Sequence, residues 1–353
     1  MLNLALVMKI YLSGFLAIAS ILSSSVYSQD QGSDPEKMFN QSIKYAAIIG
    51  LGESSHGYAN INFAKAMATQ YLADNENFNV ILFESSFTGS LIPYFLGDSL
   101  NNRCSKFLFP FWNTNSVTNA LTRFVENEKE KPLIAGFDIQ EDCRYKQFSQ
   151  YLLKNNYIKH TSDQLRLCDS ILNFYIGETA DGKRQLSVSE YNLLVAYYDS
   201  ISEEITKLTE VKEIHKKLLL HCFENRKWLC KYLTIKKIKE RMYFRDSLMA
   251  QNIIFLKNNL YSSEKIMLWA ADAHIAKMNT DEHNARWMGE WLTKTYGHGY
   301  YAISFRKGNT TGNSFIPGTA SLIIKKKTDN FQAFFSLSDL RSIEKEQWNT
   351  PCQ

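Results

Sequence analysis

The strongest constraint on the fold is a series of short apolar runs that alternate with stretches of helical pattern. The runs at 45–52, 78–85, 132–138 and 265–274 are almost continuously hydrophobic, without regular alternation of apolar and polar residues. Strands of that composition are typical of a parallel sheet that helices cover on both faces. The sequence therefore predicts an α/β fold of three layers, α/β/α, around a central, mainly parallel sheet.

A long segment without strand patterns interrupts this alternation. Between about 142 and 260 the sequence holds only helical stretches, and a further apolar strand follows at 300–305. We expect a large helical insertion within a single domain that runs from 43 to 353. The segments at 319–327 and 331–337 are apolar enough to add edge strands.

The first 28 residues have the pattern of a signal peptide. Lys9 supplies the positive charge, 10–22 form the apolar core, and small residues precede an expected cleavage near Gln29. An uncleaved membrane anchor is the alternative, although the apolar stretch is short for a span of about 20 residues. We expect an exported protein, periplasmic or secreted, with a flexible lead-in over 29–42 and no stable membrane span after cleavage.

Charge is nearly balanced, and this bears on the class of partner. The chain has 40 basic and 36 acidic residues, for a formal net charge of +4. Nucleic-acid-binding domains concentrate basic residues on one face, so the balance argues against a nucleic-acid partner. One local basic excess lies at 231–245. A solvated helix face is the commoner cause of such a run, and a polyanion site is the alternative.

The six cysteines do not form a metal-binding or redox motif. None is arranged as C-x-x-C, so a thiolate zinc site is not predicted. Export permits disulfides, and we expect one or two at most.

Reactive side chains follow the carboxyl ends of four predicted strands. In strand order they are Glu53 and His56, Glu84, Asp138, and Asp272 with His274. Ligands of open parallel sheets bind beyond the carboxyl ends of the strands, so we expect these side chains to gather at one edge. Asp138 and Asp272 are candidates for substrate binding. Trp112 lies in a loop among other aromatic residues, and either lines a pocket for a bulky apolar substrate or packs in the core.

Two imidazoles and several carboxylates suit the hydrolysis of an ester. A histidine can accept a proton from water at neutral pH, and a carboxylate beside it fixes its tautomer. A second histidine, or an arginine, can hold the oxyanion that forms. The same residue types bind Zn²⁺ or Mn²⁺, so a metal-dependent hydrolase is an alternative to a cofactor-free one. The sequence has no G-x-S-x-G, Walker A or G-x-G-x-x-G motif, which argues against a serine nucleophile and against nucleotide use.

At these residues the chain resembles the erythromycin esterase family. The resembling segments between about 47 and 305 include LGESSHG, VILFES, IAGFDIQ, RDSLMAQNI and KIMLWAADAHIAK. The resemblance implies a central, mainly parallel sheet with added helices, and hydrolysis of a small-molecule ester or lactone, as in the members that hydrolyse macrolide antibiotics. It implies that His56 is the general base and that Glu53 orients it. Glu84 matches an acid of the family's second strand motif, and His274 matches its second histidine.

The chain departs from the family pattern after the fourth strand. Where the family has W-A-H-N-x-H, this chain has Ala271 in place of the first histidine and Asp272 in place of the asparagine. Losing a polar group that contacts the transition state typically costs a few kcal/mol. A non-catalytic or diverged member that binds a hydrophobic small molecule or a metal is therefore the alternative to an esterase.

Overall fold

Two compact units make up the described part of the chain. The computed structural model describes 43–53, 56–109, 111–128, 131–141, 146–176, 185–277, 286–307 and 320–324. The first unit holds the described residues up to Asn79, Thr114–Ala120 and those from Glu264 on, and the second holds Val80–Asn113 and Leu121–Ser263. The predicted signal peptide, the lead-in and the strand at 331–337 lie outside the described residues. The prediction of a single domain stays a prediction.

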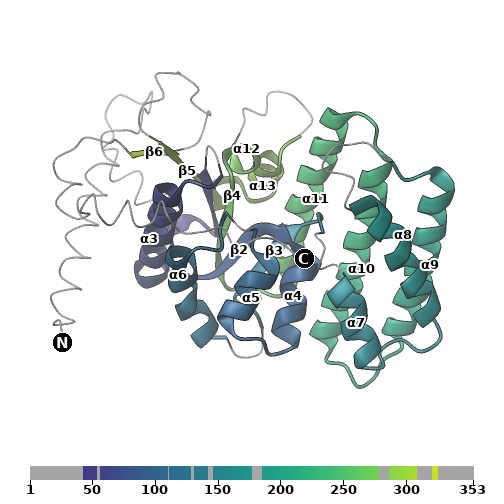
Figure 1. Cartoon of the computed structure of the whole chain (residues 1–353). Helices are drawn as coiled ribbons and strands as arrows, with labels where there is room; N and C mark the ends of the chain where they lie inside the picture. Colours follow the sequence, from purple (N-terminus) through teal and green to yellow (C-terminus); the bar gives the residue numbers. More distant parts are fainter. Residues whose placement is uncertain are drawn as a thin grey trace. The chain divides into compact units, whose positions relative to one another are not determined.

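The elements follow one another as strands and helices in both units (Figure 1). Those of the first unit are β1 (Ile48–Glu53), α3 (Ala59–Asn75), β4 (Lys265–Ala271), α12 (Asp272–Ile275), α13 (Met288–Tyr296), η2 (Gly297–Gly299), β5 (Tyr300–Lys307) and β6 (Ala320–Ile324). Those of the second unit are β2 (Phe78–Ser86), α4 (Phe87–Phe95), α5 (Leu100–Phe107), β3 (Ile134–Asp138), α7 (Lys146–Lys154), α8 (Ser162–Ile176), α9 (Val188–Thr206), α10 (Glu213–Thr234) and α11 (Ile238–Asn259). Helix α6 (Asn115–Glu126) begins in the first unit and ends in the second.

Parallel strands form the sheet of the first unit. Their order among the described residues is β4-β1-β5-β6, and every pair is parallel. The register sets Glu53 at the end of β1 beside Ala271 of β4 on one side and Phe305 of β5 on the other. All six residues of β1 are buried, as its continuous apolar run predicts. The predicted strand at 265–274 is shorter than expected, because α12 begins at Asp272.

Helices cover both faces of β1. A Cβ atom at Gly52 would lie 2.4 Å from Asp272 Oδ1 and 2.5 Å from Ile275 Cδ1, so only glycine lets α12 approach this closely. Side chains alternate along a strand, so Glu53 points to the opposite face. On that face Lys65 of α3 contacts Glu53. The predicted α/β class, with helices on both faces of a parallel sheet, is confirmed.

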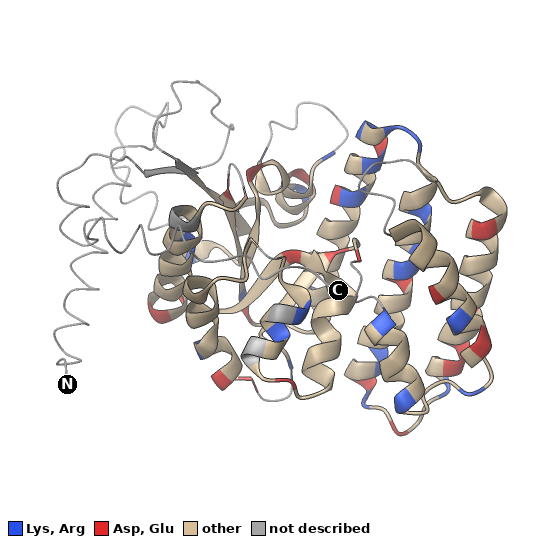
Figure 2. Cartoon of the chain, viewed as in Figure 1, with Lys and Arg blue, Asp and Glu red and all other residues tan. Residues whose placement is uncertain are grey.

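The second unit combines two parallel strands with a set of helices. β2 pairs with β3, and the register shifts between Phe83 and Ser86, which places Ser86 opposite Asp138. Helices α7–α11 occupy the stretch in which no strand was predicted, and α9 and α10 pack against each other. Basic and acidic residues are interspersed along these helices (Figure 2).

The described cysteines are buried free thiols. They are Cys104, Cys168, Cys222 and Cys230. Cys143 and Cys352 lie outside the described residues, so a disulfide that involves them stays a prediction. Within the described ranges, every helix is too short or too polar to serve as a membrane-spanning segment.

One half-buried histidine ties α10 to α11. The His221 ring stacks on Phe255 with centroids 3.6 Å apart, and Nε2 lies 2.8 Å from Asn252 Oδ1. Asn252 in turn donates to the backbone carbonyl of Phe137 at 2.9 Å, which joins α11 to β3. Burial lowers the pKa of His221 to about 4, although the hydrogen bond with Asn252 acts in the opposite direction. His221 is therefore neutral in the folded protein near pH 7.

We expect His221 to make the fold sensitive to mild acid. Its pKa rises from about 4 in the folded chain to the ordinary 6.5 on unfolding, so the unfolded state takes up a proton first and stability falls as the pH drops below 6.5. The loss between pH 7 and pH 5 is about 2 kcal/mol. Denaturant unfolding of His221→Gln at both pH values should show a smaller difference than the native protein, and His298→Gln, which changes an exposed histidine, should leave the difference intact. An unchanged pH dependence in His221→Gln would contradict this assignment.

Candidate active site

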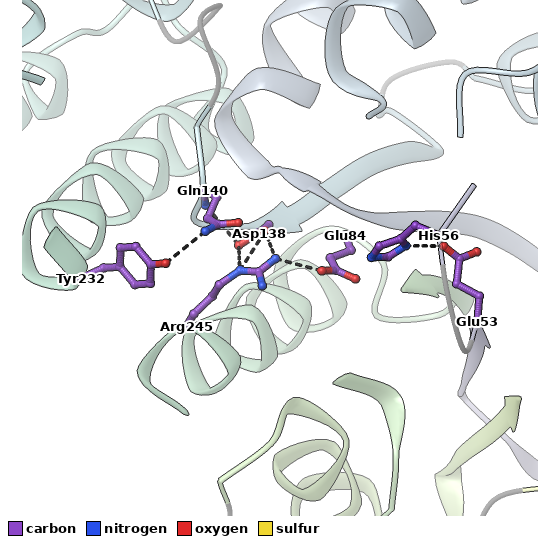
Figure 3. A network of polar contacts seen from close by, with 7 residues as sticks. All are labelled: Glu53, His56, Glu84, Asp138, Gln140, Tyr232 and Arg245. Carbon is purple, nitrogen blue, oxygen red and sulfur yellow. Dashed lines mark hydrogen bonds and ion pairs between the residues drawn. The ribbon is translucent and has the colours of Figure 1, made fainter. Parts of the chain in front are cut away.

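The end of β1 places an acid, an imidazole and an amine together. His56 Nδ1 lies 2.5 Å from Glu53 Oε1, and Lys65 Nζ donates to Glu53 Oε2 at 2.9 Å. Figure 3 shows the imidazole pointing to the Glu53 carboxylate. The side chains of Glu53 and Lys65 are 1% and 0% exposed, whereas that of His56 is 40% exposed. Glu53 is thus a buried carboxylate: its partner His56 reaches solvent, whereas its partner Lys65 does not.

The local chain path explains this arrangement. Gly57 follows His56 with φ of 84°, a backbone conformation that favours glycine, and α3 begins two residues later. Helix α3 then runs back along the sheet with a buried stripe at Ile61, Lys65 and Thr69. Residues four apart share a helix face, so this stripe carries Lys65 against the sheet. Lys65 was not predicted as a site residue, although its place on an otherwise uncharged stripe was a signal for that role.

The charge of Lys65 decides the state of Glu53. Burial alone raises the pKa of Glu53, but the Lys65 ammonium and the hydrogen bonds from His56 and Lys65 outweigh burial, and the pKa lies below its ordinary value. Glu53 is therefore ionised at neutral pH. An ionised carboxylate accepts hydrogen bonds only, so the proton of the His56 contact belongs to Nδ1. The basic lone pair of the neutral imidazole is then on Nε2.

A tryptophan completes the surroundings of the lysine. Lys65 Nζ lies 4.6 Å from the centroid of the Trp269 ring, and the indole Nε1 donates to Thr69 Oγ1 at 3.0 Å. Trp269 is fully buried in β4. An ammonium group over an indole face is attracted by the ring quadrupole, which helps to offset the cost of burying the lysine.

The end of β4 carries the second histidine. Asp272 Oδ2 accepts a hydrogen bond from Ser304 Oγ of β5 at 2.5 Å, and the Tyr300 hydroxyl donates to the Ile275 carbonyl at 2.6 Å. These contacts fix α12, on which His274 is almost completely buried. Because Glu53 and Ala271 are register partners, the segments with His56 and His274 leave the sheet from neighbouring positions.

The second unit holds Glu84 and Asp138 at the ends of β2 and β3. Arg245 of α11 joins them (Figure 3): Nε lies 3.0 and 3.1 Å from the two Asp138 oxygens, and Nη2 donates to Glu84 Oε1 at 2.9 Å. Nη2 also contacts Asp138 Oδ2. Burial opposes the guanidinium charge, but Asp138 and Glu84 outweigh it and raise the pKa of Arg245. One permanent cation therefore holds both acids in place.

A short polar chain extends from this cluster to α10. The Gln140 backbone N–H donates to Asp138 Oδ1 at 3.1 Å, and Gln140 Nε2 donates to the Tyr232 hydroxyl at 3.2 Å (Figure 3). Arg245 lies within the segment RDSLMAQNI, but its partners are 107 and 161 residues away along the chain. Their identity could not be read from local sequence.

Trp112 has no exposed surface. Its ring packs against Phe83 at 5.8 Å and Phe111 at 4.9 Å between centroids, within the second unit. These contacts favour the core interpretation of Trp112. A role in a substrate pocket stays a prediction.

The structure brings the predicted site residues into two groups. Glu53, His56, Asp272 and His274 belong to the first unit, and Glu84 and Asp138 belong to the second. The prediction that all of them act in one site stays a prediction. Among the described residues, no three histidine, cysteine or acidic side chains are grouped so that they could hold a metal ion.

Comparison with known proteins places the chain near one family. The family model described as erythromycin esterase matches residues 74–315. This match includes Glu84, Asp138 and His274 and begins after Glu53 and His56. A relative from Bacillus subtilis (strain 168) named "Putative hydrolase YbfO" is 23% identical over an alignment of 316 residues that covers 79% of this chain and 70% of the relative.

Solved structures share the fold. A Bacillus cereus protein is 20% identical with a TM-score of 0.58 and covers 82% of this chain and 74% of its own. A structure described as a succinoglycan biosynthesis protein is 16% identical with a TM-score of 0.58, and covers 82% and 75%. A mutant of erythromycin esterase EreC in its open conformation is 18% identical with a TM-score of 0.56, and covers 82% and 76%. Identities this low support the fold alone.

Removing the Lys65 charge should leave the buried Glu53 carboxylate without its ammonium partner. In Lys65→Met we expect a loss of about 3 kcal/mol or more in the free energy of unfolding at pH 7, because breaking a buried ion pair is strongly destabilising. Lys65→Arg, which keeps the charge, should lose less.

The pH dependence distinguishes this effect from lost packing. In the native protein the lowered pKa of Glu53 contributes stability that is lost as the pH falls below about 4.5. In Lys65→Met the pKa of Glu53 should lie above its unfolded value, so acidification should instead recover stability relative to the native protein. Urea unfolding from pH 7 to pH 4 measures that difference, and a constant gap between the two proteins would refute the assignment.

Proposed function

The chain belongs to the erythromycin esterase family, and on that premise we propose that it is a hydrolase that cleaves a small-molecule ester or lactone with water activated by His56. The observation that carries the proposal is the solvent-reaching imidazole on a buried, ionised carboxylate. This is the arrangement that a general base requires, because the acid holds the ring in one tautomer and stabilises the imidazolium that forms.

The first step follows from the Glu53 contact. With the Nδ1 proton directed at Glu53, Nε2 of His56 accepts a proton from water while the water oxygen attacks the ester carbonyl. Glu53 then stabilises the imidazolium, and Lys65 keeps Glu53 ionised throughout. The imidazolium returns its proton to the alkoxide leaving group, so no covalent enzyme intermediate is formed.

We assign the oxyanion to His274. It follows the strand next to β1, and the Ser304–Asp272 and Tyr300–Ile275 hydrogen bonds fix α12, the helix that carries it, before substrate arrives. Pre-oriented donors of this kind supply much of the electrostatic stabilisation in acyl transfer. Glu84 matches an acid of the family motif, and within the second unit Arg245 holds it in place.

A diverged, non-catalytic member is the second candidate, and one observation favours it. Ala271 occupies the place of a family histidine and is the register partner of Glu53. The missing imidazole would therefore have stood beside the acid that orients His56. A chain that has lost this group keeps a scaffold for binding a hydrophobic small molecule.

Chromogenic esters assayed with and without a chelator test the proposal. His56→Ala should lower kcat/KM by about 10²–10⁴-fold, which is the usual contribution of a general base. His298→Ala, an exposed histidine of the same unit, should retain full activity. We expect a chelator to have no effect.

Two other results would reject it. Turnover that the chelator abolishes would indicate metal-dependent hydrolysis by the same residues. Absence of turnover with a broad panel of esters, together with tight binding of hydrophobic ligands, would indicate the diverged member. In that case Ala271→His, which restores the family residue beside Glu53, is the variant in which to look for turnover.

We also propose that the protein is exported, on the pattern of the first 28 residues. The support is the basic residue, apolar core and small residues of a signal peptide. N-terminal sequencing of the protein from its native cells should begin near Gln29, and a chain that retains Met1 and sediments with membranes would indicate an anchor instead.

A further inference from the structure

Apart from Arg245, the basic excess at 231–245 has no part in the proposed chemistry, yet it forms a distinct surface. It spans the end of α10, a short connection and the first turns of α11 (Figure 2). Lys236, Lys237, Ile238, Lys239 and Glu240 are consecutive exposed residues. We call residues 235–243 the basic tip.

An apolar ridge runs through the basic tip. Ile238, the first residue of α11, is 67% exposed, and Met242, four residues later, is 43% exposed. Residues four apart lie one above the other on a helix, so the two side chains form a single stripe. A solvated helix face would carry polar side chains at both positions, so the ridge is not explained by solvation alone.

Cations predominate in the basic tip. It contains one acid, Glu240, and four basic residues, which are Lys236, Lys237, Lys239 and Arg241. Glu240 pairs with Lys237 at 2.8 Å. The tip therefore has a local excess of three positive charges.

Two tyrosine rings lie under these cations. Lys239 Nζ is 5.8 Å from the Tyr243 ring centroid, and the Arg241 guanidinium is 5.3 Å from that of Tyr232. Exposed aliphatic side chains, clustered cations and tyrosines are the composition of segments that lie in the interface of a lipid bilayer.

We propose that the basic tip docks the protein on an anionic phospholipid surface. Ile238 and Met242 enter the boundary between headgroups and acyl chains, and the lysines and Arg241 contact the phosphate layer. Each Lys or Arg near such a surface strengthens binding about fivefold, and the apolar side chains add the burial that a purely electrostatic contact lacks. A soluble polyanion matches the charges but leaves the ridge exposed, so lipid is the better match.

The tip lies on the helix that organises the acids of the second unit. Ile238 and Arg245 are seven residues apart on α11, about 10 Å along the helix axis. Docking through the tip thus holds the Glu84–Arg245–Asp138 cluster close to the lipid surface. The proposal does not depend on ester hydrolysis.

Vesicle flotation of the full mature chain tests the docking. We expect binding to vesicles that contain about one-third phosphatidylglycerol in phosphatidylcholine, little binding to phosphatidylcholine alone, and weaker binding at high salt. Neutralising the tip with Lys236→Gln, Lys237→Gln and Lys239→Gln should weaken binding by about a hundredfold. Ile238→Asp should weaken it by at least about tenfold.

Matched variants control for charge and for exposure. Lys207→Gln, Lys212→Gln and Lys217→Gln remove the same charge near the other end of α10, about 33 Å away along a 22-residue helix. Val188→Asp changes the first residue of α9, which is 72% exposed and so matches Ile238. Both controls should bind as the native chain does.

Three results would overturn the proposal. The first is absence of binding to the anionic vesicles. The second is that the control variants weaken vesicle binding as much as the tip variants do. The third is that Ile238→Asp leaves vesicle binding unchanged while heparin competes for it. The last result would identify a soluble polyanion as the partner. Circular dichroism of each variant confirms that lost binding is not lost folding.

Discussion

The buried ion pair between Glu53 and Lys65 is the interaction on which the candidate chemistry depends. A carboxylate with 1% exposure would ordinarily hold its proton, and a neutral acid could not serve as an acceptor for the imidazole. Lys65 reverses that preference from inside the core, where salt and solvent screen little. The orientation of an exposed histidine is thus set by a lysine that never meets the solvent.

In both units a cation from a helix pairs with carboxylates at the ends of strands, but the cation differs. In the first, an ammonium group holds one carboxylate and rests on an indole ring. In the second, the planar guanidinium of Arg245 reaches two carboxylates at once, a geometry that a lysine could not reproduce. Acids at the ends of parallel strands are costly to bury, and each unit meets that cost with a cation from a helix packed on the sheet.

The sequence predicted the strands and their reactive ends well, because both are local properties. Continuous apolar runs identify buried strands, and β2 was expected at 78–85 and found at Phe78–Ser86. The short helix α12 was missed, because contacts from β1 and β5 rather than its own four residues determine it. Lys65 escaped assignment for a similar reason: a basic residue is taken for a surface residue until its distant partners are known.

The pairing of β1 with β4 makes two remote stretches of chain a single chemical unit. Position 271 stands 218 residues after Glu53 in the sequence and directly opposite it in the sheet. A substitution at either place changes the setting of the other, and α12 packs so closely on β1 that a Cβ atom at Gly52 would lie 2.4 Å from Asp272 Oδ1. These two strand ends are therefore coupled, and we expect variation at one to be accompanied by variation at the other among relatives.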